Sequence, residues 1–170
     1  MLTKQRIQNA YITLRRQHTL DQIRVTELCQ IAKTNRTTFY HYYNDIYDLT
    51  NAVEDSLLKE ALSGFKYRGL IYDDPQQYFQ EFYKALLPIQ KDLDLLGQGR
   101  EANQYVKIER WLVELAMKDT SNSEEEVFMT FVIGGVVHTV FENRTSKKYS
   151  EEYYTRQLKR ILRYVMKMKQ

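Results

Sequence analysis

The side chains that could do chemistry are gathered in one short stretch, residues 36–43. Hydroxyl, phenol and imidazole groups follow one another there, on Thr37, Thr38, Tyr40, His41 and Tyr42. Such groups donate hydrogen bonds to phosphates or contact base edges, and a threonine methyl can meet a thymine methyl. The stretch therefore predicts binding to nucleic acid. The alternative interpretation is a polar helix that faces solvent in a small bundle.

A preceding helix is expected to hold this stretch in place. Leu28, Cys29 and Ala32 give an apolar face to about two turns over residues 25–33. Asn35 then provides a favoured N-cap for the polar helix. Two short helices joined by a tight turn match a helix-turn-helix, whose second helix enters the major groove of DNA.

Charge is unevenly distributed along the chain. Residues 1–44 contain seven Lys or Arg and two acidic residues, whereas residues 45–170 contain 18 basic and 20 acidic residues. A basic N-terminal quarter predicts an anionic partner for that segment. The last 18 residues hold six basic and no acidic residues, so a second basic segment competes for the same interpretation.

Composition excludes several classes of protein. The 170 residues suffice for one or two small domains, and 43% hydrophobic with 28% charged residues is typical of a globular chain. Six Gly and two Pro are too few for the turns of an all-β fold. The single cysteine, Cys29, cannot form an internal disulfide, and we expect it to be buried rather than nucleophilic.

The sequence contains no enzymatic or metal-binding motif. It has no glycine-rich phosphate loop, no Gly-x-Ser-x-Gly elbow, no His-Glu-x-x-His helix and no CxxC pair. We therefore expect no enzyme, no metal ion and no cofactor. The N-terminus lacks a signal-peptide segment, and the apolar stretch at residues 127–141 carries polar residues such as His138. We expect a cytoplasmic protein without a membrane partner.

Helical periodicity predicts an all-α fold with nine helices. We place the helices at about residues 3–17, 25–33, 36–43, 45–63, 75–86, 88–96, 101–118, 124–143 and from 150 onward. Residues 69–75 are expected to be a linker, with Pro75 at the first position of the next helix. The stretch at 127–141 is apolar nearly all round, which predicts a helix buried on most sides.

The residues from Val25 to Leu49 resemble the DNA-binding signature of TetR/AcrR transcriptional regulators. The resemblance is carried by the Thr38-Phe39-Tyr40 core, the aromatic Tyr43 and the following helix with Leu49. It implies a helix-turn-helix DNA-binding domain at residues 1–48, with its motif at about 25–43. It further implies a connecting helix at 45–63 and a helical domain for ligand binding and dimerisation at 64–170.

The resemblance assigns roles to individual residues. It places one group toward the major groove, namely Arg36, Thr37, Thr38 and His41. It places a second group at phosphates: Thr26, Lys33, Tyr40 and Tyr42. Phe39 and Tyr43 are expected in the core on Leu14 and Leu28. The sequence departs from the family pattern with Lys33 in place of the turn glycine, Arg24 in place of a threonine N-cap, and Ile46 in place of a lysine.

The C-terminal domain offers candidate residues for two further roles. Phenols and an imidazole among aromatic rings could orient a flat, partly polar ligand, which selects Tyr78, Phe82, Tyr105, Trp111 and His138. The last two helices hold apolar surface and a Gly134-Gly135 pair suited to close helix contact in a dimer. The expected dimer residues are Phe131, Gly135, His138, Leu158, Ile161, Leu162 and Val165. The alternative for both sets is ordinary burial inside the bundle.

The implied function is a homodimeric repressor that a small-molecule effector releases from a palindromic operator in double-stranded DNA. The alternative is an adaptor or co-activator on the same scaffold, which acts mainly through contacts with another protein. The missing phosphate-binding lysine and turn glycine favour that alternative.

Overall fold

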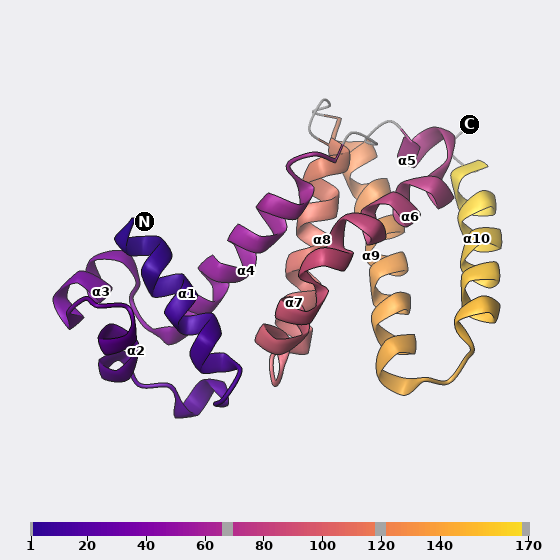
Figure 1. The fold of residues 1–170 in the computed structure, drawn as a ribbon. Helices are drawn as coiled ribbons and strands as arrows, with labels where there is room; N and C mark the ends of the chain where they lie inside the picture. Colours follow the sequence, from indigo (N-terminus) through magenta and orange to yellow (C-terminus); the bar gives the residue numbers. More distant parts are fainter. Residues whose placement is uncertain (1, 66–69, 118–121, 168–170) are drawn as a thin grey trace. The chain divides into compact units, whose positions relative to one another are not determined.

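The computed structural model describes residues 2–65, 70–117 and 122–167, which are helical almost throughout and contain no strand. The chain divides into two compact units (Figure 1). The first unit comprises Met1–Gly64 with Ala85–Gly99, and the second comprises Phe65–Lys84 with Arg100–Gln170. The predicted all-α class is confirmed.

The first unit contains five α-helices and two short 3-10 turns. The helices are α1 (Thr3–Arg15), α2 (Val25–Ile31), α3 (Arg36–Tyr42), α4 (Ile46–Leu62) and α7 (Gln90–Gly97). The turns are η1 (Leu20–Gln22) and η2 (Leu87–Ile89). The sequence predicted that Pro88 begins a helix, but the α-helix begins only at Gln90, after η2.

One continuous apolar core holds the first unit together. Tyr11, Leu28, Phe39, Leu49 and Leu96 are each fully shielded from solvent in this core. The buried Tyr11 hydroxyl lies 2.6 Å from the Thr50 hydroxyl, which itself donates to the Ile46 carbonyl at 2.7 Å. This chain of hydrogen bonds ties α1 to α4 without leaving a polar group unpaired at the contact.

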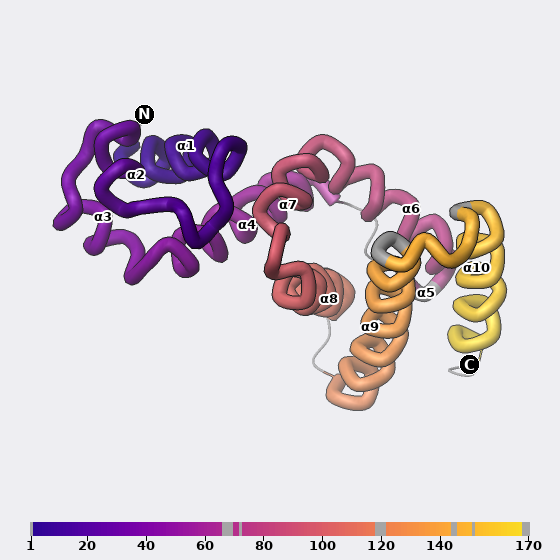
Figure 2. Tube along the Cα trace, turned by 90° about the horizontal axis from the view of Figure 1, so that it is seen from below, coloured from indigo at the N-terminus to yellow at the C-terminus, as the bar shows by residue number. Residues whose placement is uncertain are grey.

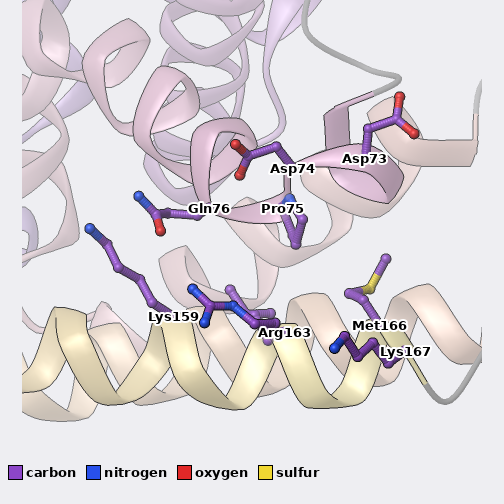
Figure 3. Close-up of a pocket in the computed structure, with 9 residues that line it drawn as sticks. Asp73, Asp74, Pro75, Gln76, Lys159, Arg163, Met166 and Lys167 are labelled. Atoms are coloured by element: carbon purple, nitrogen blue, oxygen red, sulfur yellow. The ribbon is translucent and has the colours of Figure 1, made fainter.

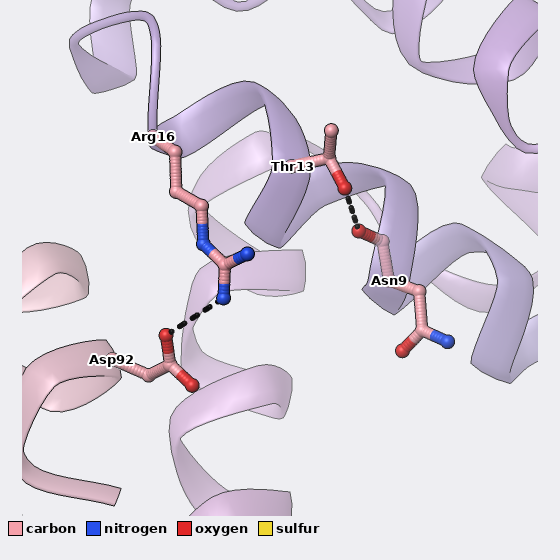
Figure 4. A network of polar contacts seen from close by, with 4 residues as sticks. All are labelled: Asn9, Thr13, Arg16 and Asp92. Carbon is pink, nitrogen blue, oxygen red and sulfur yellow. Dashed lines mark hydrogen bonds and ion pairs between the residues drawn. The ribbon is translucent and has the colours of Figure 1, made fainter.

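Helix α7 is bound to α1 by two arginines. Arg15 is 3% exposed and donates to the carbonyls of His18 at 2.9 Å and Leu95 at 2.6 Å. Its neighbour Arg16 reaches the Asp92 carboxylate at 3.4 Å (Figure 4). Residues 85–99, which the sequence analysis grouped with the C-terminal domain, therefore belong to the first unit, because α7 completes its core.

The second unit contains the remaining helices. They are α5 (Leu70–Asp73), α6 (Pro75–Leu86), α8 (Glu101–Met117), α9 (Ser123–Ser146) and α10 (Glu151–Lys167). Helix α6 begins at Pro75 as predicted. Among the described residues, the predicted set of nine helices was incomplete, because α5 forms inside the segment that we expected to be a linker.

Two groups of apolar side chains build the second unit. Phe65 packs edge-on against Tyr78 at 5.4 Å and Phe82 at 6.0 Å between ring centroids. Val132 and Val136 of α9 pack with Leu162 of α10 in another buried cluster. Helices α9 and α10 accordingly run side by side in both views (Figures 1 and 2).

The expectation that α9 is buried on most sides was wrong. Val127 is 71% exposed and Phe131 is 72% exposed. Helices α8 and α10 cover other sides of α9, through contacts that include Val132 and Val136. In the described part of the chain, no helix is long and apolar enough to cross a membrane.

Candidate nucleic-acid interface

The turn between α2 and α3 is closed by a backbone motif that requires a left-handed residue. The Thr34 N–H donates to the Cys29 carbonyl at 2.9 Å, and the Lys33 N–H donates to the Gln30 carbonyl at 3.2 Å. This pair of bonds is the Schellman arrangement that ends many helices. Lys33 has a φ of 50°. The predicted left-handed turn residue is confirmed, and such a conformation costs an L-residue about 1–2 kcal/mol.

Side-chain caps fix where α3 and α4 begin. Asn35 accepts a hydrogen bond from the Thr38 N–H at 2.8 Å, and Asp45 accepts one from the Asp48 N–H at 2.7 Å. The predicted N-cap at Asn35 is therefore confirmed, and Asp45 caps α4 in the same way. Arg24 precedes α2 without a side-chain cap, as its departure from the family pattern predicted.

The inner face of α3 is anchored by aromatic rings. Phe39 is fully buried and Tyr43 is 3% exposed, in the same cluster as Leu14 and Leu28. Their ring centroids lie 5.8 Å apart. The predicted core role of Phe39 and Tyr43 is confirmed, and this anchoring fixes which face of α3 points outward.

The outward face of α3 carries the polar residues on which the prediction rests. Arg36, Thr37 and His41 are exposed, and Thr38 is half-buried. Tyr40 is 48% exposed, with the Arg36 guanidinium 5.8 Å from its ring centroid. The ring of Tyr42, which is 41% exposed, stands edge-on to His41 at 5.1 Å.

The other two predicted DNA-binding residues also reach solvent. Lys33 is exposed in the turn before α3, and Thr26 is exposed on α2. The eight predicted residues are therefore all accessible to a partner, and their roles toward DNA stay predictions.

Less of this region's positive charge is exposed and unpaired than the sequence suggests. Arg15 is buried on backbone carbonyls, and Arg16 is paired with Asp92. Arg6 is partly buried and donates to the Thr3 hydroxyl at 3.3 Å. Four exposed cations that form no ion pair within the described residues remain among residues 2–44, namely Lys4, Arg24, Lys33 and Arg36.

The beginning of α4 differs most from the family pattern. Ile46 is 9% exposed and belongs to the core, so its side chain cannot contact a phosphate. The Asp48 carboxylate accepts hydrogen bonds from the Asn44 N–H at 2.9 Å and from the Asn44 side-chain amide at 3.1 Å. With Asp45 as N-cap, two carboxylates stand at this helix end.

Sequence reasoning missed Tyr47, which is 55% exposed at the second position of α4. The signal was present: Asp45 sets where α4 begins, and Ile46, Leu49 and Val53 share one apolar face. Position 47 must then point away from the core.

Cys29 is 4% exposed, as expected. Burial raises the pKa of the Cys29 thiol, and the charge of Arg36 lowers it to a smaller extent. A thiol of this kind is a core residue rather than a nucleophile.

The predicted ligand-binding residues fall into separate places in the second unit. Tyr78 and Phe82 are buried against Phe65. The Tyr105 ring instead meets His138 at 5.7 Å, and burial followed by the charge of Glu109 raises the pKa of Tyr105. Trp111 is half-buried. The structure thus brings together Tyr105 with His138 and Tyr78 with Phe82, but not all five.

The predicted dimer residues include an open face and a covered one. Phe131, Gly135 and His138 are exposed on α9, and Ile161 is 55% exposed on α10. Leu162 is buried by Val132 and Val136 of its own chain. The last two, Leu158 and Val165, are half-buried in that same cluster. We define the dimer face as the four open residues, because only these can meet another molecule.

Among the described residues, no group of three or more His, Cys, Asp or Glu side chains is arranged to hold a metal ion. Comparisons with models of protein families and with curated proteins find no match to this chain. The resemblance to TetR/AcrR regulators therefore rests on the sequence from Val25 to Leu49.

Proposed function

We propose that this protein is a sequence-specific DNA-binding transcriptional regulator that acts as a homodimeric repressor. The observation that carries the proposal is the geometry of α2, its left-handed turn at Lys33, and α3. Phe39 anchors α3 from inside, while Arg36 and His41 stand on the outside. A short helix held in this way, with donors on its outer face, suits the major groove.

The outer residues divide by the chemistry that they offer. Arg36, Thr37, Thr38 and His41 would meet base edges, as the family resemblance implies. Phosphates would be contacted by Thr26, Lys33, Tyr40 and Tyr42. The exposed phenol of Tyr47, at the second position of α4, would donate to the phosphate that Ile46 cannot reach.

A dimer would set the half-site spacing. Two recognition helices read a palindrome when they lie about 34–36 Å apart, or a multiple of this distance. The dimer face on α9 and α10 would meet its copy across a twofold axis, and a stable interface would bury more than about 1,200 Å². A ligand of the second unit would then act by favouring one dimer geometry by a few kcal/mol, transmitted through α4.

Salt dependence tests the DNA contacts. Binding to labelled DNA fragments from upstream of the protein's own gene can be measured by fluorescence anisotropy. We expect the fragment that binds most tightly to contain a palindromic site. A dimer with about 6–8 phosphate contacts should give a slope of log affinity against log salt near −5 to −7. A slope near zero for a bound palindrome would contradict the proposed face.

The chain provides a matched control for Arg36. Arg36 and Arg156 each have a guanidinium 5.8 Å from a tyrosine centroid, and both are exposed. Arg36→Ala and His41→Ala should each lower operator affinity by about 1–3 kcal/mol. Arg156→Ala should leave operator affinity unchanged. Equal effects of the two arginine variants would mean that the wrong helix has been assigned to the groove.

Sedimentation tests the dimer. The wild type should be a dimer at micromolar concentration, and Phe131→Asp should be a folded monomer with much weaker operator binding. Leu87, which is 48% exposed in the first unit, supplies the control Leu87→Asp, which should stay dimeric. A monomeric wild type would overturn the repressor mechanism.

The beginning of α4 favours a second candidate function. With Ile46 in the core and two carboxylates at this helix end, the protein has less attraction for phosphate there. An adaptor that acts through another protein would dimerise normally but bind every DNA fragment equally weakly. The anisotropy and sedimentation experiments together separate the two functions.

A further inference from the structure

A cavity of about 370 Å³ opens in the second unit between α10 and the junction of α5 with α6 (Figure 3). None of the residues that the sequence analysis selected for ligand binding lines it. One wall comes from the α5–α6 junction, with Asp73, Asp74, Pro75 and Gln76, and the other from α10, with Lys159, Leu162, Arg163, Met166 and Lys167.

The α10 wall carries concentrated positive charge. Lys159, Arg163 and Lys167 are spaced four residues apart, so they form one row along the helix. After Glu152 the helix contains no acidic residue. Among the described residues, none of these three cations forms an ion pair. Their charge is available to something that enters the cavity.

The opposite wall neutralises this charge only in part. Asp74 accepts a hydrogen bond from the Gln77 N–H at 3.0 Å, so its carboxylate is engaged as the N-cap of α6. The Asp73 side chain points away from α10 in Figure 3, whereas Lys159 and Arg163 extend toward Gln76. The positive end of the twelve-residue α6 adds to the field. The cavity therefore favours an anion.

The floor of the cavity is apolar. Leu162 is 5% exposed, and it packs with Met166 in the cluster that joins α9 and α10. The ring of Pro75 lies at the opposite edge. A ligand that touched only the cations would leave the half-buried side chains of Met166 and Pro75 in water, so a complementary ligand combines a charged group with a hydrocarbon part.

We propose that this cavity binds a small amphiphilic organic anion, a carboxylate or phosphate monoester with a hydrocarbon body. Arg163 holds the anionic group through the two parallel N–H donors of its guanidinium. Lys159 and Lys167 flank it, and the hydrocarbon covers Leu162 and Met166. Binding of the anion to this cavity is measured on the protein alone, so a failure to bind DNA would not affect the test.

Calorimetric titration of the full chain with four probes tests the proposed ligand class. Octanoate and octyl phosphate should bind, and their ratio shows which anionic group the site prefers. Inorganic phosphate should bind at least about tenfold more weakly than octyl phosphate, because it leaves the apolar floor uncovered. Octylammonium should not bind. Binding of octylammonium as tight as that of the anions, or no binding of either octyl anion at about 1 mM, would overturn the proposal.

Matched arginine variants of α10 test the site. Arg163→Gln should weaken octyl anion binding about tenfold or more, and Arg163→Lys should weaken it less. Arg156→Gln changes an exposed arginine of the same helix that does not line the cavity, and it should bind like wild type. Circular dichroism must show equal helix content in all three variants. An equal loss for Arg156→Gln, or no loss for Arg163→Gln, would contradict the assigned site.

Discussion

The α3 region of the first unit and helix α9 of the second expose different kinds of large side chain. Around α3 and the beginning of α4, the exposed aromatic residues are tyrosines, namely Tyr40, Tyr42 and Tyr47. On α9, the large exposed residues are hydrocarbons, with Val127 and Phe131 each more than 70% exposed. Phenols offer a hydrogen-bond donor beside an apolar ring, whereas valine and phenylalanine offer only apolar area.

This difference indicates two kinds of partner. Phenols beside arginine and lysine suit a polar, anionic surface such as a phosphate backbone. A row of hydrocarbons on a helix is costly in water and suits another apolar surface. The outer face of α3 is thus polar, whereas Val127 and Phe131 of α9 are apolar side chains that the described part of the chain leaves exposed.

The largest expected effect contrasts two phenylalanines. Phe39→Ala empties a fully buried site in the first unit and should lower the free energy of unfolding by about 3–5 kcal/mol. Phe131→Ala removes a side chain that is 72% exposed and should change monomer stability by less than about 0.5 kcal/mol. Urea unfolding at a concentration where dimers dissociate measures both. A large loss for Phe131→Ala in the monomer would mean that α9 is covered within its own chain.

A second contrast concerns two tyrosine hydroxyls. Thr50 uses its own proton toward the Ile46 carbonyl, so the Tyr11 hydroxyl donates to Thr50. Tyr11→Phe removes this bond and should cost about 1–1.5 kcal/mol. The buried Tyr154 hydroxyl of α10 has no partner in the described part of the chain, so Tyr154→Phe should be neutral or slightly stabilising.

The buried Tyr154 hydroxyl also makes stability depend on pH. Burial raises the pKa of Tyr154 to about 12, whereas a tyrosine in the unfolded chain has a pKa of about 10. The unfolded chain therefore ionises first, and wild type loses stability as the pH rises from about 10 to 12. Tyr154→Phe should escape this part of the loss, so its advantage in urea unfolding should grow at alkaline pH. An advantage that stays constant or shrinks would mean that Tyr154 is solvated.

A third contrast uses the adjacent glycines of α9. A Cβ added to Gly135 would meet nothing within 4 Å, whereas one added to Gly134 would lie 2.9 Å from a carboxylate oxygen of Glu109. Gly135→Ala should therefore stabilise the monomer by about 1 kcal/mol, and Gly134→Ala by less. In the proposed dimer, Gly135→Ala should weaken association, which sedimentation would detect. Unchanged association would place the interface elsewhere.

Local signals in the sequence predicted most of the candidate interface. The N-caps at Asn35 and Asp45, the turn at Lys33 and the anchoring by Phe39 each follow from interactions within a few residues of the chain or from a strong apolar preference. The sequence also predicted that Cys29 is buried, because it shares the apolar side of α2 with Leu28.

Features that depend on distant residues were not predictable. Arg15 counted as a surface cation in the sequence, but its burial depends on the Leu95 carbonyl, 80 residues away. The open face of α9 was predicted only in part: Phe131, Gly135 and His138 were expected at a dimer contact, but the exposed Val127 was not. A helix that is apolar nearly all round has no periodicity from which to choose its exposed side. The cavity beside α10 was missed because its two walls come from segments far apart in the chain.

The smallest expected effect concerns two lysines in the left-handed conformation. Lys33 ends α2 and Lys147 ends α9, each with a φ of 50°. Lys→Gly at either position relieves a strain of about 1–2 kcal/mol, but glycine also gives the unfolded chain more freedom, so the net gain should stay below about 1 kcal/mol.

Only Lys33 lies beside α3. Lys33→Gly should therefore weaken binding to all DNA sequences and make the salt slope of the dimer less steep by about 2, one for each lost phosphate contact. Lys147→Gly should give the same gain in urea unfolding with DNA affinity unchanged. If both variants bind DNA like wild type, Lys33 makes no phosphate contact, and the polar face of the first unit does not extend to its turn.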